Sequence, residues 1–425
     1  MESSSHEPIS GPASVKGKVS ATSTSPEDKY PEGGAEAWGV AIGTSLSLFC
    51  TLGYVNSFGV YQAYYMHNQL SDEDPSHVSW IGSLQFFLVF AVSIFGGPLF
   101  DRFGAKIIIP SAIAYVFSIM MTSLAQDYYQ FMLAQGILGG ITSGLVLNPA
   151  MAATSQYFDK NRGAAIGLAI AGSSLGGVVI PLALSRMLAN ESLGFGWAVR
   201  IIGFISVALL AVACILVKER LPPRKKEFFL LKAFAEKKYI WVTISGFFLF
   251  LGMFTPYFFL PDYALSRGMD PLQASYLIAI LNGTSFPGRV IPGILSDKFG
   301  RFNMYAIASV ATSILLFCWT QCTSHSAIYA FTVLYGFFSG GIVSGNSISL
   351  ASTTDNPTNI GTYMGQAMPI ISLASLIGPP ISGAFLAAYQ GYQELAIFSG
   401  VACIIGFLSV LMSKSTTREG LLGLA

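Results

Sequence analysis

The chain has 425 residues, of which 52% are hydrophobic and only 11% are charged, and its mean hydropathy is +0.58. An ordinary soluble domain has about 25% charged residues, so this composition excludes an ordinary soluble fold. The formal net charge of +1 argues against a nucleic-acid binder, which would present a basic face. Several long uncharged stretches instead predict an all-α integral membrane protein, because about 20 apolar residues cross the bilayer as a helix.

The first segment, residues 1–36, is rich in Ser, Pro, Gly and Glu and contains no apolar run. This composition predicts a disordered cytoplasmic tail. A signal peptide is not expected, because no hydrophobic region follows Met1. The first membrane helix is therefore expected to act as an uncleaved insertion signal.

Twelve apolar segments follow, six before and six after a polar stretch at residues 218–238. We predict a membrane helix in each of them, at about residues 38–65, 79–100, 106–125, 129–155, 163–188, 197–218, 239–264, 272–295, 303–323, 327–353, 361–388 and 391–413. The expected domains are an N-terminal six-helix half at 37–218, a cytoplasmic linker at 219–238, a C-terminal six-helix half at 239–413 and a cytoplasmic tail at 414–425.

The basic residues predict the orientation of the helices. With the N-terminus inside, 19 of the 23 Lys and Arg residues fall in cytoplasmic segments. Arg186, Arg200 and Arg267 lie on or near the outside, and Arg289 lies within a helix. Such an asymmetry places both termini in the cytoplasm, and the plasma membrane is the expected location.

An internal repeat relates the two groups of six helices. Residues 100–104 (FDRFG) recur as 296–300 (SDKFG), and residues 139–144 (GGITSG) recur as 340–345 (GGIVSG), at nearly the same offset along the chain. A Gly-x-x-x-Gly pair in the fifth segment also recurs in the eleventh. These matches predict two parallel six-helix halves, the architecture of transporters that bind substrate at the interface and rock around it.

The two repeated loops combine an acid, a base and a turn-forming glycine on the cytoplasmic side. Such a loop can pair with a neighbouring helix end and stabilise one conformation, so we expect these residues to form gates. The alternative is a tight turn whose charges only set the topology. The predicted gating residues are Asp101, Arg102, Gly104, Asp297, Lys298, Gly300 and Arg301.

Three motifs carry a resemblance to a known family. Residues 97–106 (GPLFDRFGAK) resemble the signature loop between helices 2 and 3 of the major facilitator superfamily. Residues 157–172 (YFDKNRGAAIGLAIAG) resemble the start of helix 5 in its monocarboxylate-porter family, and residues 31–39 (PEGGAEAWG) are similar to that family's lead into helix 1. The Ser-rich tail and short linker look like the fungal branch, many of whose members accompany secondary-metabolite pathways.

The fifth segment combines small residues with a proline. Gly163, Gly167 and Gly172 allow helix backbones to approach closely. Pro181 can bend the same helix. Helix packing and a hinge are both open interpretations of these residues.

Arg289 is the sharpest candidate for substrate binding. It lies in the eighth segment, and burying an unpaired guanidinium in a membrane is costly. It should therefore face an aqueous cavity and bind a carboxylate, and the resemblance implies substrate contact for an arginine in this helix. There are two alternatives. The side chain could extend to the membrane–water interface, or it could pair with Asp297.

Two departures from the family argue against simple lactate–proton symport. Ser285 occupies the position where proton-coupled lactate carriers have an aspartate four residues before the arginine. Their helix-1 lysine has no counterpart in residues 54–58 (YVNSF). The known acid–base groups for moving a proton together with a small carboxylate are therefore missing.

The remaining candidates for the cavity are uncharged polar and aromatic side chains. They suit a larger, partly aromatic molecule held by stacking and a few hydrogen bonds. Taken alone, each one is more readily interpreted as a helix–helix contact, and only the set indicates a roomy site. The predicted substrate-binding residues besides Arg289 are Asn56, Tyr61, Asn148, Tyr257, Asn282, Asn346 and Gln366, with Tyr64, Phe258 and Tyr363 as further lining residues.

An enzyme is not expected, because the four histidines form no metal set and the chain lacks a Gly-x-Ser-x-Gly elbow and a phosphate-binding loop. No cofactor or metal is expected, and Cys318 and Cys322 are interpreted as packing residues. The leading hypothesis is a secondary active transporter that exports an organic-acid-like or secondary metabolite by alternating access. Its partners are the lipid bilayer and an anionic or aromatic small molecule. The alternatives are uptake of a small monocarboxylate or vitamin-like molecule, and a transporter-like sensor.

Overall fold

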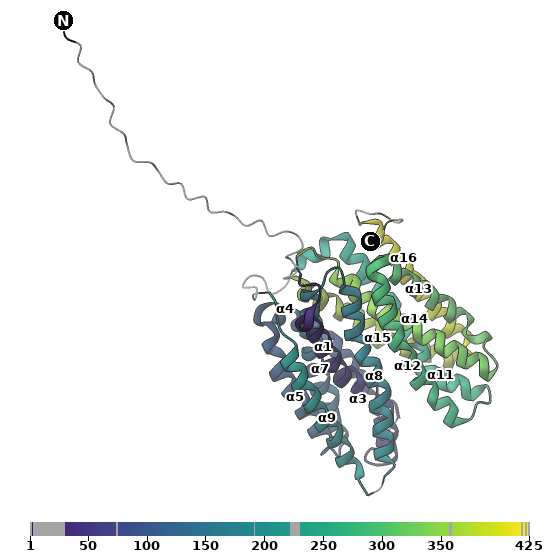
Figure 1. Cartoon of the computed structure of the whole chain (residues 1–425). Helices are drawn as coiled ribbons and strands as arrows, with labels where there is room; N and C mark the ends of the chain where they lie inside the picture. The colour runs from purple at the N-terminus through teal and green to yellow at the C-terminus, as the bar shows by residue number, and fades with distance from the viewer. Residues whose placement is uncertain are drawn as a thin grey trace.

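The computed structural model is all-helical (Figure 1). It describes residues 30–73, 75–190, 192–221, 230–356 and 359–417, together with Glu2, Gly420 and Gly423. Most of the expected disordered tail, the middle of the expected linker and most of the expected C-terminal tail lie outside the described residues.

The first half of the chain follows the predicted order of helices. The first predicted segment consists of two helices that meet at Asn56 and Ser57, and the second also consists of two, which meet at Val92. The elements are α1 (Gly34–Val55), α2 (Phe58–His67), α3 (Pro75–Ala91), α4 (Ser93–Phe103), the short 3-10 helix η2 (Gly104–Ile107), α5 (Ile108–Thr122), α6 (Tyr128–Phe131), the π-helix η3 (Met132–Leu138), α7 (Gly139–Tyr157), α8 (Arg162–Leu188) and α9 (Gly194–Leu216).

The second half repeats this pattern. Its first predicted segment also breaks into two helices, at Phe254, where Pro256 occupies the start of the second helix. The elements are η4 (Leu231–Ala235), α10 (Lys237–Met253), α11 (Thr255–Ser266), α12 (Pro271–Phe299), α13 (Arg301–Cys318), η5 (Trp319–Gln321), α14 (His325–Ala351), α15 (Ile360–Tyr389) and α16 (Gln393–Ser415).

Ten helical stretches of the described residues are long and apolar enough to cross a membrane. One of them, His77–Thr122, has 46 residues, which is about two crossings at 20 residues each. The chain reverses within it at Gly104, whose φ of 71° is in the left-handed region. Helix α12 is not among the ten, because polar residues such as Asn282 and Arg289 lower its hydropathy. The structure therefore agrees with the predicted all-helical membrane fold.

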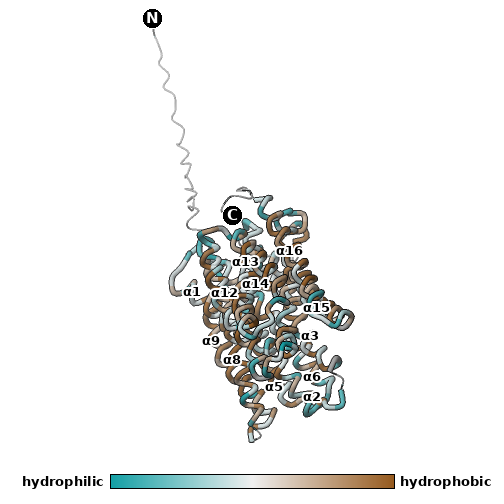
Figure 2. The backbone as a smooth tube through the Cα atoms, turned by 90° about the vertical axis from the view of Figure 1, so that its right-hand side faces the viewer, coloured by the Kyte–Doolittle hydropathy of each residue, from teal (hydrophilic) through white to brown (hydrophobic). Residues whose placement is uncertain are grey.

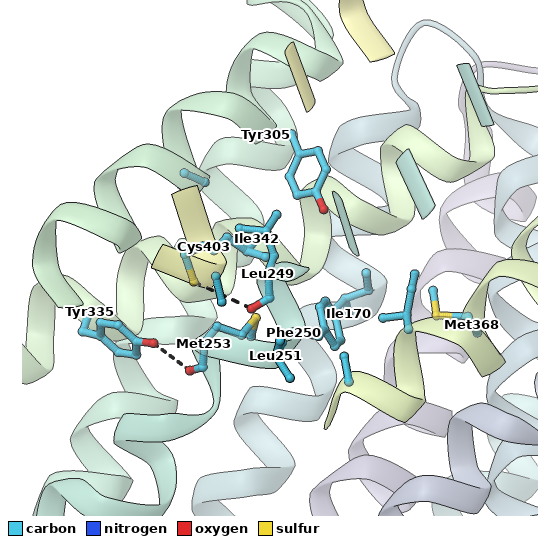
Figure 3. Close-up of a cluster of buried hydrophobic side chains, with 14 of the residues drawn as sticks. Ile170, Leu249, Phe250, Leu251, Met253, Tyr305, Tyr335, Ile342, Met368 and Cys403 are labelled. Carbon is cyan, nitrogen blue, oxygen red and sulfur yellow. Dashed lines mark hydrogen bonds between the residues drawn. The ribbon is translucent and has the colours of Figure 1, made fainter. Parts of the chain in front are cut away.

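The helices are predominantly hydrophobic along their length, and hydrophilic positions gather near the ends of the bundle (Figure 2). One cluster of buried apolar residues comes entirely from positions 37–217. A second comes mainly from positions 233–410, with a few residues of the first half such as Ile170 of α8. Figure 3 shows part of this second cluster, in which the Tyr335 hydroxyl donates a 2.6 Å hydrogen bond to the Met253 carbonyl. Each half therefore has its own core, and residues of α1, α3, α7 and α8 extend from the first half into the second core.

The two groups of helices lie together at one end of the bundle and diverge toward the other (Figure 1). The end where they meet carries the repeated loops 101–104 and 297–300, and it is called the loop end below. Across it, Asp101 of the first loop contacts Thr362 of α15, and Asp297 of the second contacts Gly163 of α8. The halves are therefore closed against each other at the loop end.

Candidate functional site

The contact between the halves is made by small residues. Helix α8 packs against α12, and α4 packs against α15. A β-carbon on Gly163 would lie 2.2 Å from the Gly293 carbonyl oxygen, and one on Gly97 would lie 2.0 Å from the Gly361 carbonyl oxygen. Such distances leave no room for a side chain, so the backbones of the two halves touch at these points.

The other predicted packing or hinge residues also lie in α8. A β-carbon on Gly167 would lie 2.6 Å from the Arg289 carbonyl oxygen, across the interface. Gly172 instead faces α1, where a β-carbon would lie 2.1 Å from the Ser45 carbonyl oxygen. Pro181 lies inside α8, which continues to Leu188. These glycines have packing contacts in this structure, and a hinge at them remains a prediction.

Asp101 reaches from the end of α4 to the start of α15. Its carboxylate accepts a 2.9 Å hydrogen bond from the backbone N–H of Thr362 and another from the Thr362 hydroxyl. Thr362 is the third residue of α15, where the unpaired N–H groups and the helix dipole favour a negative charge. The first repeated loop therefore caps a helix of the opposite half.

Asp297 makes the corresponding contact from the second loop. Its two carboxylate oxygens accept backbone N–H hydrogen bonds from Gly163 (2.7 Å) and Ala164 (2.8 Å), in the first turn of α8. The repeat seen in the sequence is thus also a repeat of contacts, because each loop aspartate binds a helix N-terminus of the other half.

The bases of the two loops differ in their contacts. Arg301 of α13 donates to the Asp159 backbone carbonyl, lies 3.4 Å from the Asp159 carboxylate and donates to the Ser352 hydroxyl at 3.1 Å. Arg102 and Lys298 are exposed, and the Arg102 guanidinium lies 5.6 Å from the ring of its neighbour Phe103. Arg301 therefore bridges the halves in this structure, whereas the first base of each loop faces outward.

Both loop glycines adopt a backbone conformation that favours glycine, with φ of 71° at Gly104 and 94° at Gly300. The Gly104 turn packs against Glu219, whose carboxylate accepts a 2.9 Å hydrogen bond from the Ala105 N–H. Sequence reasoning missed Glu219. The signal that could have found it is its position as an acid between Lys218 and Arg220 at the start of a linker rich in basic residues.

Arg162 makes a further contact between the halves that sequence reasoning did not predict. From the sequence, this residue was expected to hold the cytoplasmic end of the fifth segment and to contribute to the topology. Its side chain is 3% exposed, and it donates to the Ala351 carbonyl at the end of α14 at 3.1 Å. An arginine buried to this extent requires hydrogen-bond partners, and it finds them in both halves. Its place inside the helix-5 motif was the available signal.

Arg289 also spans the interface. Its Nη1 donates to the Ile170 carbonyl of α8 at 3.0 Å and to the Ser173 hydroxyl, while its Nε is buried without a hydrogen-bond partner among the described residues. The guanidinium does not pair with Asp297, whose oxygens bind the start of α8. With 7% exposure, Arg289 does not reach the membrane surface either. Arg289 thus neither extends to the membrane–water interface nor pairs with Asp297, and it bonds to the opposite half instead.

Some of the predicted polar residues gather near this interface. The Asn56 amide nitrogen and the Asn282 amide oxygen lie 2.8 Å and 3.4 Å from where a β-carbon on Gly177 would be. The Tyr257 hydroxyl is 3.4 Å from the Ser339 hydroxyl. The Gln366 amide oxygen is buried without a hydrogen-bond partner in the described part of the chain. Asn56, Asn282 and Tyr257, with Arg289, form the candidate substrate site, and Gln366 remains a predicted lining residue.

Other predicted lining residues lie inside their own halves. Tyr61 is fully buried between Tyr54 and Tyr65, so a substrate would reach it only if this aromatic cluster opened. The remaining residues of this kind have local partners: Asn148 binds Ser93, Asn346 accepts from Tyr305, Tyr64 stacks on Phe195 and Tyr363 donates to Glu236. Phe258 is 59% exposed. The sequence predicted that each of these residues lies in a helix. Whether its side chain faces the interface or its own half depends on how the helices pack.

Two hollows of the surface lie away from these residues. One of about 340 Å³ is lined by residues between Met121 and Leu138, and one of about 180 Å³ is lined by residues between Phe234 and Phe248 together with Ile370. Neither contains any predicted substrate-binding residue.

The structure has two helical halves that contact each other at one end, and two buried arginines, Arg162 and Arg289, bond across their interface. This arrangement defines a membrane transport protein of the secondary-carrier class. The family profile described as Major Facilitator Superfamily matches residues 43–379 and 293–422. The chain belongs to this superfamily, whose members are transporters and not enzymes.

Two curated relatives are fungal efflux proteins. The chain is 49% identical over 393 residues to the aspyridones efflux protein of Emericella nidulans, covering 92% of this chain and 80% of the relative. It is 38% identical over 389 residues to the agnestins efflux protein of Paecilomyces divaricatus, covering 90% and 88%.

Solved structures share the fold at low sequence identity. The human organic anion transporter MFSD10 superposes with a TM-score of 0.70 at 17% identity, covering 91% of this chain and 100% of that one. The proton:xylose symporter XylE of the same superfamily gives 0.72 at 15% identity, covering 92% and 98%. The chain is thus a multi-pass membrane transporter of the major facilitator fold.

Proposed function

We propose that this transporter exports an anionic, partly aromatic secondary metabolite across the plasma membrane by alternating access. The observation that carries the proposal is the 49% identity to an efflux protein for aspyridones over 92% of the chain. The helix-5 motif further supports membership of the monocarboxylate-porter-like branch. Because most Lys and Arg residues belong to loops on one side, we propose that the loop end and both termini are cytoplasmic.

Arg289 is the proposed anchor for the negative group of the substrate. Its unused Nε and its planar fork suit a carboxylate or an enolate. The side chains around it are amides and hydroxyls such as Asn282 and Tyr257, which favour a large, weakly charged molecule over a small one. In the cycle, the substrate anion replaces the Ile170 carbonyl as the partner of Arg289, so binding loosens one bond between the halves.

The gates supply the other part of the cycle. With the loop end closed, as in this structure, the site opens toward the far side of the membrane. Breaking the Asp101 and Asp297 contacts would separate the halves at the loop end and expose the site to the cytoplasm. The substrate then loads from the cytoplasm and leaves after the gates close again.

The test is flux into proteoliposomes with a mixed panel of small carboxylates and larger aromatic acids, with and without a pH gradient. Flux restricted to the larger compounds is the expected result. Gradient-driven accumulation of a small monocarboxylate would replace export by uptake as the function. Absence of flux for every compound would favour a sensor.

Arg289→Lys tests the anchor. We expect about a tenfold loss of flux, because lysine loses the bidentate fork but keeps the charge. The matched control is Arg200→Lys in α9, where the arginine binds Ser123 within the first half. Near wild-type flux in correctly inserted Arg289→Lys protein would remove Arg289 from the substrate site.

A further inference from the structure

The segment before α1 is built into the loop end of the molecule. Its motif, residues 31–39, was noted in the sequence only for its resemblance. Here Glu32 has a φ of 56°, which turns the chain back toward the α7–α8 connection. Its backbone N–H donates to the Tyr157 carbonyl at 3.2 Å.

The Glu32 carboxylate holds the turn that precedes α8. It accepts backbone N–H hydrogen bonds from Asp159 (2.8 Å), Lys160 (2.8 Å) and Asn161 (3.1 Å). The Asn161 side-chain amide also donates to the Glu32 carbonyl at 3.1 Å. Charge-assisted hydrogen bonds to backbone N–H groups are among the stronger ones, so this turn is fixed by a residue that is distant in sequence.

The same turn carries contacts to the opposite half. Asp159 binds Arg301, and Arg162, three residues further on, binds the Ala351 carbonyl. The next two backbone N–H groups, of Gly163 and Ala164, bind Asp297. One carboxylate of the same half and one of the other half thus share the start of α8.

Tyr30 ties this segment to the two arginines beside it. Its ring lies 5.6 Å from the Arg162 guanidinium carbon and 5.4 Å from that of Arg220. The Tyr30 hydroxyl accepts a 3.3 Å hydrogen bond from Arg162 Nη2. The stretch from Tyr30 to Glu32 therefore contacts the turn, the buried arginine and the start of the linker together.

We infer that Glu32 is a positioning residue of the loop-end gate. It holds the turn 159–161 in the geometry in which Asp159, Arg162 and the start of α8 reach their partners in the other half. Asp297 leaves the start of α8 when the gate opens, whereas Glu32 stays bound to it. The inference rests on the proposed alternating-access function, because the gate has its role only in that cycle.

The test is a distance measurement between spin labels on the two halves of the full-length protein. Lys106→Cys, in η2 beside the first loop, and Lys298→Cys, in the second loop, place labels at exposed positions. The background has Cys50, Cys214, Cys318, Cys322 and Cys403 replaced. Neither lysine makes one of the contacts between the halves described above, and Lys298, although predicted as a gating base, is exposed in this structure. We expect Glu32→Gln to lower the closed-to-open ratio about tenfold, seen as a new population at longer distance.

A matched control and a second variant keep the result interpretable. Glu36→Gln removes the same charge four residues away, from an exposed carboxylate whose contact is a 3.3 Å bond from the Tyr157 hydroxyl, and should leave the distances unchanged. Glu32→Asp keeps the charge on a shorter side chain and should give an intermediate shift in distance. If Glu32→Gln does not fold, the Glu32→Asp variant is used for the test instead. A lowered melting temperature with unchanged distances in the Glu32 variants would overturn the inference.

The readout separates this inference from the proposed function, because it needs no substrate. A shifted distance in a protein that transports none of the panel compounds would support the positioning role and count against export. Normal export together with distances unchanged by Glu32→Gln would support export and overturn the positioning role.

Discussion

The two repeated loops make the same primary contact but differ in what surrounds it. In the first, Asp101 binds the start of α15 and Glu219 supports the turn from the linker. In the second, Asp297 binds the start of α8, and Arg301 adds a bridge to Asp159 at 3.4 Å. Both copies of the motif therefore use the aspartate to cap a helix of the other half, but the hydrogen bonds and ion pairs around the two aspartates differ.

One position accounts for much of the difference. The residue after the loop glycine is Ala105 in the first loop and Arg301 in the second. Alanine contributes only its backbone N–H, whereas arginine reaches across the interface. The second loop should therefore contribute more to the free energy of the closed state.

The largest effect is expected where the backbones touch. Gly163→Ala would place a β-carbon 2.2 Å from the Gly293 carbonyl oxygen, and overpacking of this kind costs about 1–3 kcal/mol. We expect the closed-to-open ratio, measured with the label pair at positions 106 and 298, to fall by about tenfold or more. Gly283→Ala in α12 is the control, since no atom lies within 4 Å of its β-carbon position. A closed population equal to that of the control would mean that the halves tolerate the extra atom.

The aspartates should come next, with similar effects on both loops. Asp101→Asn and Asp297→Asn each weaken charge-assisted hydrogen bonds to a helix N-terminus, for a loss of about 1–2 kcal/mol. Turnover in the flux assay should slow about fivefold to tenfold, with little change in KM. A loss of substrate affinity at unchanged turnover would contradict the gating role.

Arg301→Ala should act on the second loop alone and make it resemble the first. The Asp159 pair is partly exposed, so we expect a smaller loss of about 1 kcal/mol, or roughly a fivefold decrease in the closed-to-open ratio. Combining Arg301→Ala with Asp297→Asn should give less than the sum of the two effects, because both variants loosen the same contact. Strict additivity would show that the bridge and the cap act independently.

The smallest effects are expected at Arg102 and Lys298, which are exposed in this structure. Arg102→Gln and Lys298→Gln should change turnover by less than about twofold. Insertion in the membrane should be checked by the accessibility of both termini, because these residues also contribute to the orientation signal. A large drop in turnover of correctly oriented protein would mean that these bases bind across the interface in another state of the cycle.

The sequence predicted the loops and the repeat because both are local patterns of charge and glycine. It also predicted that Arg289 is a special residue, since a guanidinium inside an apolar helix needs a partner. It did not predict Ile170 as that partner, because the contact is a backbone carbonyl that any residue type could supply. Tyr61 shows the same limit, since the polarity of a side chain does not say whether it faces the interface or its own core.

Glu32 shows a different limit. Its partners, residues 159–161, lie more than 120 positions further along the chain, and no periodicity links the two segments. The two motifs that contain these residues were visible separately, and only the fold brings them together. Contacts of a carboxylate with backbone N–H groups leave no complementary residue type in the sequence to search for.

The glycine contacts between α8 and α12 and between α4 and α15 act as a mechanical stop. Backbone meets backbone there, although the side chains of Ser296 and Asp297 are also close to Gly163. The limit of closure is therefore set mainly by main-chain atoms, which cannot be repacked. Apart from the bond of Arg289 to Ile170, the closed geometry thus does not depend on the side chains that line the substrate site. Substitutions around Asn282 and Tyr257 could change which molecules are carried while the halves still close to the same position.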